Sequence, residues 1–338
     1  MPRRNASTSP IAAVAARAGV SIATVSRVIN GVPNKATADT IRRVQEAVAA
    51  LSYRPISAGR ALRERRSRLV AVLAPNLANP AMAAIAASIE GALRGAGLVM
   101  VVCDTHDDPA IQDEYLAEMR AQRARAAVLL GAVASPGLDA MPQDLPLLFV
   151  GRRRPGRLGP YIGIDNRLAG TDAANFFLER GLRVLGVLHG AMTSSATAER
   201  VTAFCDRLAQ SGHRLPRSRV RTRSDAHHAE IGLLEAPELL RGACASAGIF
   251  CSSDLIAYGA HRALEARRAR VTILGFDDNP LNDWLAPWLS SIQVPFPAFG
   301  PAVATALANF EHGETVADVI LPHRLIARRQ CPDEHNGH

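Results

Sequence analysis

The sequence is poor in cysteine, in aromatic residues and in unbroken apolar segments. Its cysteines are Cys103, Cys205, Cys244, Cys251 and Cys331. They show no paired metal-ligand spacing, and an odd number argues against a closed set of disulfides. The most apolar window, residues 69–93, is interrupted by prolines and asparagines, and the charged N-terminus is followed by no apolar signal core. These absences exclude a disulfide scaffold, predict no metal site and no membrane partner, and favour a cytoplasmic location.

Lysine is almost missing as well, since Lys35 is the only one, yet the chain is strongly basic. Its 39 basic residues exceed its 31 acidic ones, and the net charge of +8 favours a polyanionic partner. Arginines concentrate at residues 60–68 and 152–157. Because Pro155 and Gly156 mark the second run as a turn, we interpret it as a solvated loop rather than a second nucleic-acid site.

Residues 11–31, IAAVAARAGVSIATVSRVING, predict a helix-turn-helix. Apolar residues recur at i, i+3, i+4 and i+7 from Ile11 to Ala18, and Gly19 can adopt the left-handed conformation that ends a helix. Ser21 then caps a second helix. This helix turns its apolar face toward the first and leaves polar residues and an arginine outward near its N-terminus, where a recognition helix contacts bases.

The same stretch resembles a known DNA-binding signature. AVAARAGVSIATVSRVING, continued by Thr37, Thr40, Leu51 and Tyr53, is similar to the helix-turn-helix of the lactose/galactose repressor (LacI/GalR) family of bacterial transcriptional regulators. The first helix departs from that family, with Pro10 in place of the usual threonine cap. Position and resemblance together indicate the DNA-contacting residues, which are Ser21, Ile22, Ala23, Thr24, Ser26, Arg27, Asn30, Tyr53, Arg60 and Leu62.

A third helix and a short basic linker follow. Thr37 caps a helical pattern whose buried stripe runs through residues 41–51 and closes a small core. Residues 56–67 are too poorly apolar to fold alone. In the resembled family the matching segment folds as a hinge helix on operator DNA, and its leucine, here Leu62, wedges between base pairs from the minor groove. A passive spacer is the alternative, because Gly59 costs about 1 kcal/mol of helix propensity.

From residue 69 onward, apolar strands alternate with helical segments. Strand patterns such as LVAVLAP, VMVVCD and VTILGFDD predict parallel sheets that are covered by helices on both faces. Two such runs of similar size resemble the periplasmic-binding-protein-like core of the same family, in which the chain crosses three times between two doubly wound lobes. We expect these crossings near Ile164, Val294 and Val319.

The expected fold is therefore an all-α helix-turn-helix head followed by a two-lobed α/β core. The head covers residues 8–54, the hinge helix or linker 55–67 and the core 68–332. Lobe 1 takes about residues 68–164 and 295–318, and lobe 2 takes about residues 165–294 and 319–332.

A ligand in such a core is expected between the lobes, where strand ends and helix N-termini converge. The residues predicted to bind it are Asn76, Asn79, His106, Arg200, Ser253, Asp254 and Asp277. By resemblance, Arg200 matches the arginine of the family's R-x-x-G-aromatic motif, and Asp277 matches the first aspartate of its G-[FY]-D-D motif. An arginine and a carboxylate that face one cavity hold neighbouring hydroxyls through charge-assisted hydrogen bonds.

Other interpretations of these residues stay open. A mutual salt bridge is the alternative for Arg200 and Asp277, and helix capping is the alternative for Asp254. The family's aromatic platform after the first strand is missing, because the chain reads Asn79-Pro80-Ala81-Met82. Candidates to replace it are Phe296, Trp284 and Trp288. Residues interpreted as loop positions are Asp165, Asn166, Asp278 and the pair His227-His228.

Together these features predict a homodimeric, cytoplasmic transcriptional repressor whose partners are operator DNA and a small polar, sugar-like effector. No cofactor is predicted. An enzyme built on the α/β core is the strongest alternative, but the sequence has no G-x-S-x-G elbow, P-loop, G-x-G-x-x-G turn or metal cluster. A transport binding protein is opposed by the helix-turn-helix and by the missing signal peptide. The sequence names neither the effector nor the operator.

Overall fold

The computed structural model describes residues 10–29, 36–53, 67–224, 226–240, 247–267 and 271–328. The chain divides between Ser67 and Arg68 into two compact units. We call Met1–Ser67 the head and Arg68–His338 the core.

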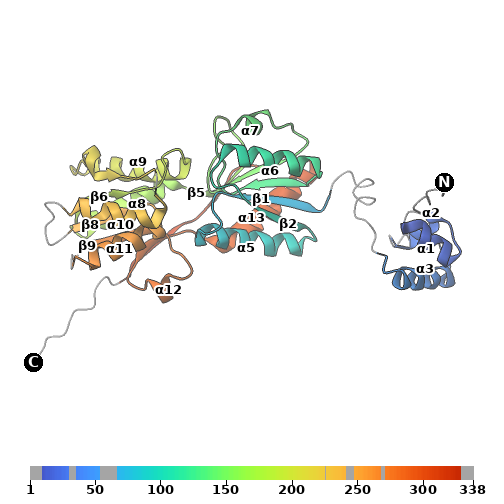
Figure 1. Cartoon of the computed structure of the whole chain (residues 1–338). Coiled ribbons are helices and arrows are strands. Elements are labelled where there is room, and N and C mark those ends of the chain that lie inside the picture. The colour runs from blue at the N-terminus through green and yellow to red at the C-terminus, as the bar shows by residue number, and fades with distance from the viewer. Residues whose placement is uncertain are drawn as a thin grey trace, which may run out of the picture. The chain divides into compact units, whose positions relative to one another are not determined.

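The head is a bundle of three helices around one apolar core (Figure 1). Its helices are α1 (Pro10–Ala18), α2 (Ile22–Ile29) and α3 (Ala38–Ala50). Their buried side chains are Val14, Ala15, Ala18, Val25, Val44 and Ala47. Helices α1 and α2 meet at 96°, an angle typical of a helix-turn-helix. No single helix among the described residues is long and apolar enough to cross a membrane. Only the combined length and composition of the bent pair α1 and α2 would suffice for a membrane span.

Local sequence signals set the bounds of the head helices. Gly19 takes a φ of +64°, the left-handed conformation that ends α1. The Ser21 hydroxyl accepts a hydrogen bond from the Thr24 amide at 3.1 Å, and the Thr37 hydroxyl accepts one from the Thr40 amide at 3.3 Å. The predicted helix-turn-helix and both predicted caps are confirmed.

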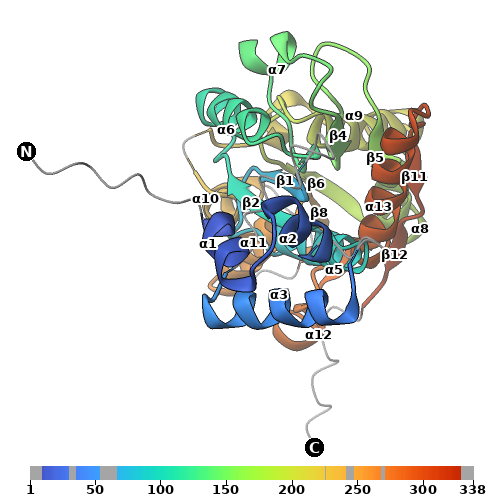
Figure 2. The same cartoon turned by 90° about the vertical axis from the view of Figure 1, so that its right-hand side faces the viewer.

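Lobe 1 of the core is built on a six-stranded parallel sheet in the order β11-β5-β4-β3-β1-β2. Its strands are β1 (Leu69–Ala74), β2 (Val99–Asp104), β3 (Ala126–Leu129), β4 (Leu147–Val150), β5 (Tyr161–Ile164) and β11 (Val319–Leu321). Helices α5 (Pro80–Gly95) and α13 (Phe296–His312) cover one face, and α6 (Pro109–Ala121) and α7 (Pro136–Ala140) cover the other. Figure 2 shows the two pairs of helices on opposite sides of this sheet.

Lobe 2 repeats this plan with a second six-stranded sheet in the order β12-β10-β9-β8-β6-β7. Its strands are β6 (Arg183–Leu188), β7 (Val220–Arg221), β8 (Ala247–Cys251), β9 (Val271–Asp277), β10 (Ser290–Gln293) and β12 (Arg324–Ile326), which pairs antiparallel with β10. The helices on one face are α8 (Asn166–Glu179) and α9 (Ser195–Gln210); on the other face they are α10 (His228–Leu239) and α11 (Asp254–Glu265). The short helices are a 3-10 turn (Arg217–Arg219) and α12 (Asn282–Leu285).

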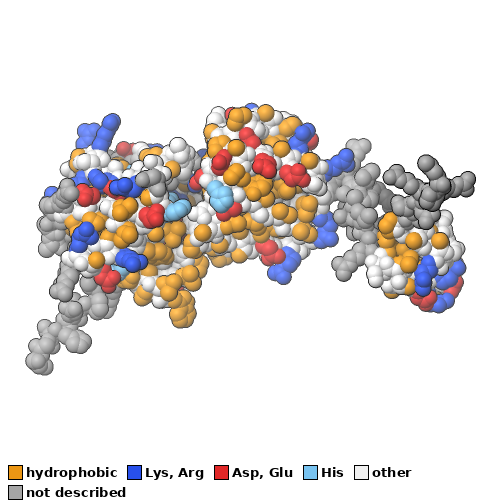
Figure 3. Space-filling view, viewed as in Figure 1, with side chains coloured by type: hydrophobic (Ala, Val, Ile, Leu, Met, Phe, Trp, Pro, Cys, Tyr) orange, Lys and Arg blue, Asp and Glu red, His pale blue; other side chains and the backbone are white. Residues whose placement is uncertain are grey.

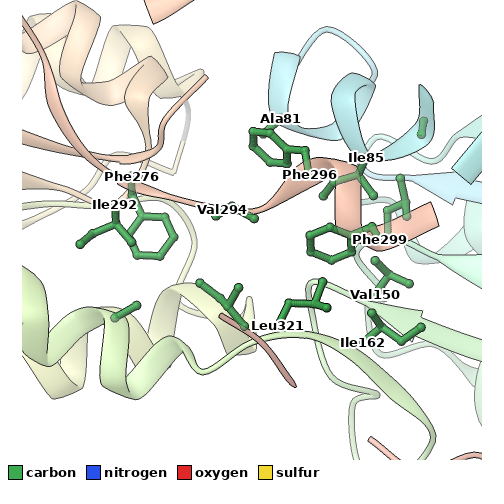
Figure 4. Packing of buried hydrophobic residues seen from close by; sticks show 14 of the residues in the cluster. Ala81, Ile85, Val150, Ile162, Phe276, Ile292, Val294, Phe296, Phe299 and Leu321 are labelled. Carbon is green, nitrogen blue, oxygen red and sulfur yellow. The ribbon is translucent and has the colours of Figure 1, made fainter. Parts of the chain in front are cut away.

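The chain crosses between the lobes from β5 to α8, from β10 to α13, and from β11 to β12. The last crossing follows Leu321, near the expected Val319, but residues 319–321 belong to lobe 1 rather than lobe 2 because β11 pairs with β5. Apolar side chains continue through the crossings. Figure 4 shows Val294 between Phe276 of lobe 2 and Phe296 of lobe 1, all within one buried cluster.

Two glycines allow α10 and α11 to pack with their backbones in contact. A Cβ on Gly259 would lie 1.8 Å from the Ala229 carbonyl oxygen, and a Cβ on Gly232 would lie 2.0 Å from that of Ile256. No side chain larger than hydrogen fits at either position. Because α10 begins at His228 and α11 begins at Asp254, this contact fixes two strand-end regions of lobe 2 relative to each other.

Candidate functional site

Helix α2 carries half of the predicted DNA-contacting residues. Ile22 is 48% exposed, Ala23 and Arg27 are also exposed, and Thr24 and Ser26 are half-buried at the edge of its outward face. An isoleucine at such exposure on a small domain is available to contact the thymine methyl group or the sugar backbone. The residues that face outward therefore lie on the first two turns of α2.

Arg27 is the cation of this face, and no ion pair involving it is found in the described part of the head. The arginines of α3 differ, because Arg42 bonds to both Asp39 and Glu46, at 2.7 and 3.1 Å. Tyr53 is half-buried against the head core, which leaves only part of its ring accessible. The other predicted contacts, Asn30, Arg60 and Leu62, lie outside the described residues.

The core contains a cavity between its two lobes, which we call the interlobe cavity. Its volume is about 100 Å³, which is below the roughly 300 to 1,000 Å³ of typical small-molecule sites, and the empty space reaches about 700 Å³ when its opening to solvent is included. The lining residues from lobe 1 and the crossings are Asn79, Ala81, Met82, Ile85, Leu130, Gly151, Arg152, Ile164, Val294, Phe296 and Phe299. Those from lobe 2 are Ser194, Ala196, Thr197, Arg200, His228, Ser252, Ser253 and Asp277.

Arg200 is held rigidly at the lobe 2 side of the interlobe cavity. Its Nε donates to the Asn166 side-chain oxygen at 2.7 Å, its Nη1 donates to the Ser252 carbonyl at 3.3 Å, and its guanidinium lies 3.5 Å from the centre of the Phe276 ring. Burial lowers the pKa of Arg200, while Asp277 opposes this shift. Asn166, interpreted from sequence as a loop residue, is buried and positions this arginine.

Asp277 ends β9 and faces the same cavity with a strained backbone. Its φ is +114°, a region that L side chains rarely adopt, and such strain is concentrated at functional sites. Burial raises the pKa of Asp277 to about 8, against the opposing effect of Arg200. No salt bridge within 4 Å joins Asp277 to Arg200 in the described core, so the two side chains face the cavity separately rather than satisfying each other.

Among the lining residues that were not predicted from sequence, Arg152 and His228 carry charged or titratable side chains. Arg152 follows β4 and pairs with Asp107 at 2.5 Å, so its half-buried side chain is not part of a solvated loop. His228 begins α10, and its Nδ1 lies 3.0 Å from the Ser253 hydroxyl. Its pKa is lowered by burial and next by Arg152. Arg152 closely follows the end of β4, and this position was the signal that could have identified it.

Known families match both units of the chain. A model described as bacterial regulatory proteins of the lacI family matches residues 11–55, and a periplasmic binding protein-like domain matches residues 174–331. The HTH-type transcriptional regulator MalR of Streptomyces coelicolor is 31% identical over 94% of this chain and 96% of its own length. GntR of Pseudomonas aeruginosa, another HTH-type transcriptional regulator, is 31% identical over 93% of each. The chain belongs to the LacI family of transcriptional regulators.

Solved structures share the fold of this LacI-family regulator. The lac repressor dimer bound to operator and the anti-inducer ONPF superposes with a TM-score of 0.81, at 23% identity over 94% of this chain and 97% of that one. The transcriptional regulator CelR in complex with cellobiose superposes with a TM-score of 0.70, at 25% identity over 95% of this chain and 99% of that one. The predicted fold class, a helix-turn-helix head with a two-lobed α/β core, is confirmed, and the protein is a regulator rather than an enzyme.

Some ligand candidates of the LacI-family regulator lie away from the interlobe cavity. His106 is 68% exposed on a turn after β2, and Asn76 accepts a hydrogen bond from the Ala78 amide within its own loop. Neither lines the cavity among the described residues. Asn79 and Ser253 do line it, although each also caps the helix that follows it.

Asp254 is buried and does not line the interlobe cavity. Its carboxylate accepts hydrogen bonds from the Asn279 amide, the Asn282 side chain and the Ser291 hydroxyl, all at 2.7–2.8 Å. Burial raises its pKa to about 6. Asp278 is not a simple loop cap either, because it is buried and pairs with Arg328 at 2.7 Å.

Among the proposed replacements for the aromatic platform, only Phe296 lines the interlobe cavity. Trp288 stacks on His261 at 3.7 Å, and Trp284 is 82% exposed on α12. Asp165 caps α8 as predicted, by accepting a hydrogen bond from the Leu168 amide at 2.9 Å. No group of three His, Cys, Asp or Glu side chains among the described residues is placed to hold a metal ion.

Proposed function

We propose that this LacI-family regulator acts in the cytoplasm as a homodimer, reads operator DNA with α2 of each head, and changes its operator affinity when a small polar effector binds in the interlobe cavity. The observation that carries the effector proposal is the separate presentation of Arg200 and Asp277 to a cavity lined by both lobes. A cavity with walls on two lobes couples ligand binding to their arrangement. A ligand that binds one arrangement better than another shifts the population toward it.

An exposed apolar surface on lobe 2 supports self-association. Figure 3 shows hydrophobic side chains gathered over α12. Leu281, Trp284 and Leu285 are exposed there by 49%, 82% and 74%. Contiguous exposed apolar patches on soluble domains mark interaction surfaces, and aromatic residues are enriched in the centre of such interfaces. A second copy of the chain is the occupant that a two-headed DNA reader requires.

We expect Arg27→Ala to weaken binding to the operator by about 1 to 3 kcal/mol while leaving binding to random DNA nearly unchanged, because an arginine on a recognition helix bonds to guanine edges. The operator should be a pseudo-palindrome of about 14 to 20 base pairs read by two heads. Gel shifts with the gene's upstream DNA and with random DNA measure both affinities. Arg42→Ala removes an equal charge already neutralised by acids on α3, and serves as the control. Equal losses on both DNAs would contradict base reading by Arg27.

A thermal-shift screen of sugars, polyols and nucleosides against the protein tests the effector site. A ligand at 100 times its dissociation constant should stabilise the fold by about 2.7 kcal/mol. This gain should vanish in Arg200→Ala and Asp277→Ala, because both remove a charged group from the cavity. Arg167→Ala, which changes an exposed residue of α8 outside the cavity, is the control. A hit that stabilises all variants equally would place the ligand elsewhere.

A further inference from the structure

We propose that the effector of this regulator is an anionic, hydroxyl-rich small molecule, of the class of sugar acids and sugar phosphates, whose charged group binds between Arg152 and Arg200. The inference rests on the proposed function, in that it takes the interlobe cavity as the effector site, and it adds the charge of the ligand. Its basis is the unequal distribution of cations and anions around the cavity.

Arg152 is a preorganised cation on the lobe 1 side. Its two terminal nitrogens donate to the two carboxylate oxygens of Asp107, at 2.5 and 3.2 Å. A guanidinium has five N–H donors, so the two hydrogen bonds to Asp107 leave three donors of Arg152 for other partners. The missing side chain of Gly131 makes room for the group, since a Cβ there would lie 3.2 Å from the Arg152 Cζ and 2.9 Å from Pro75. The guanidinium is thereby fixed before any ligand arrives.

His228 reports a positive potential in the same space. Its ring packs over Gly190, where a Cβ would lie 2.6 Å from the His228 Nε2. Burial is the largest cause that lowers the pKa of His228, and Arg152 and Arg200 lower it further, while Asp107 opposes them. Two arginines, one from each lobe, therefore lie near the same point of the cavity wall, and the charge of Asp107 offsets part of theirs. A negative charge at that point would be attracted by both.

The acids near the cavity do not balance these cations. Asp277 is the one carboxyl among the lining residues, and burial raises its pKa above neutrality. A protonated carboxyl donates a hydrogen bond to an anion instead of repelling it. Asp107 keeps its negative charge in the pair with Arg152 and offsets part of that arginine's charge, although it is not among the lining residues. Asp254 accepts three internal hydrogen bonds away from the lining. Two arginines and one carboxyl thus line the cavity, and its wall carries more positive than negative side chains.

Uncharged groups of the cavity complement the rest of such a ligand. Helices α5, α9 and α11 all begin at the lining, through their capping residues Asn79, Ser194 and Ser253. Each adds the partial positive charge of a helix N-terminus to the two guanidiniums. Thr197 adds a hydroxyl for polar contacts, and Phe296 and its apolar neighbours from lobe 1 face the carbon skeleton.

The test compares ligands of matched skeleton and different charge on the full-length protein. Gluconate, glucose 6-phosphate, glucose and sorbitol are titrated by calorimetry, with thermal shift as a second readout. The first two ligands distinguish a carboxylate from a phosphate as the source of the charge. We expect at least one of them to bind about tenfold or more tightly than glucose and sorbitol, in line with a charge-assisted hydrogen bond. Inorganic phosphate controls for binding of any anion.

Three variants locate the charge recognition. Arg152→Gln should lower the affinity for the anionic ligand about 10- to 100-fold and change the affinity for the neutral ligands by less than about twofold. Asp107→Asn should raise the affinity for the anionic ligand several-fold, because it removes a negative charge beside Arg152. Arg157→Gln removes a charge from the same loop, where that arginine is exposed and donates to the Asp139 carbonyl, and should change neither class.

Two outcomes would overturn the inference and differ in what they say of the proposed function. If only neutral polyols bind, and Arg200→Ala and Asp277→Ala abolish that binding, the effector site stands and its anionic specificity is wrong. If no compound of either class binds while operator DNA is still bound, the effector site and the inference both fail. Equal loss of anion binding in Arg157→Gln and Arg152→Gln would reduce the effect to general electrostatics and also contradict the assignment.

Discussion

Replacement of Asp277 by asparagine is expected to stabilise the ligand-free protein. Burial raises the pKa of Asp277 to about 8, so the ionised carboxylate opposes folding. Asparagine keeps the shape, cannot ionise and tolerates the positive φ of +114° at this position better than most residues. At pH 8 the substitution should raise the free energy of unfolding by on the order of several kcal/mol, and the melting temperature by about 5 to 10 °C.

The pH dependence of stability distinguishes removal of a buried carboxylate from removal of any surface carboxylate. A carboxyl whose pKa is raised in the folded state contributes stability fully below about pH 4, and that contribution is lost as the pH rises through about 8. The advantage of Asp277→Asn should therefore grow between pH 4 and pH 8 in thermal melts. Asp144 is fully exposed, and Arg120 holds its pKa below the ordinary value, so Asp144→Asn should show no such growth. A flat difference for Asp277→Asn would mean that Asp277 stays ionised beside Arg200.

Gly259→Ala should destabilise the core by about 3 kcal/mol or more. Its Cβ would lie 1.8 Å from the Ala229 carbonyl oxygen and 2.9 Å from the Leu233 amide nitrogen, and backbone atoms cannot rotate away. Helices α10 and α11 must separate, which overpacks or opens the buried cluster beneath them. The separation also displaces His228 from Ser253, so affinity for an effector should fall with stability.

The control is the same substitution on a helix with open space. Gly91 lies on the exposed side of α5, and no heavy atom lies within 4 Å of the position its Cβ would take. Gly91→Ala should therefore stabilise by about 0.5 to 1 kcal/mol through helix propensity. Urea unfolding of both variants measures the contrast. A small loss in Gly259→Ala, comparable to that of an ordinary surface change, would show that α10 and α11 adjust without cost.

The elements that sequence predicts well are those whose signals are local. Caps at Ser21 and Thr37 define the head helices, and continuous apolar runs define most strands of both sheets. The sequence pattern did not predict α8, α10 or α13. Helix α10 contains Pro237, and α13 contains Pro301 and begins with Phe296-Pro297. From sequence alone, these prolines indicate an interruption of the helix. Packing against α11 and α5 overrides them, as shown by the glycine contacts of α10 and α11.

For the site, strand-end positions identified the region but not the direction of each side chain. Asp277 and Arg152 both follow strands and face the cavity, whereas His106 follows β2 and faces solvent. Asp254 does not line the cavity, because its carboxylate bonds to residues 279–291, and no local pattern of the sequence brings these residues to it.

The three crossings between the lobes have a consequence for synthesis of the chain. Lobe 1 lacks α13 and β11 until residue 321 has left the ribosome, although its first five strands are made before any of lobe 2. During that interval the face of its sheet that α13 covers, and the edge of β5 that β11 pairs with, stay open to solvent. The nascent protein therefore carries an incomplete lobe through nearly the whole of translation, and protection of that lobe from aggregation depends on how soon the last segments arrive.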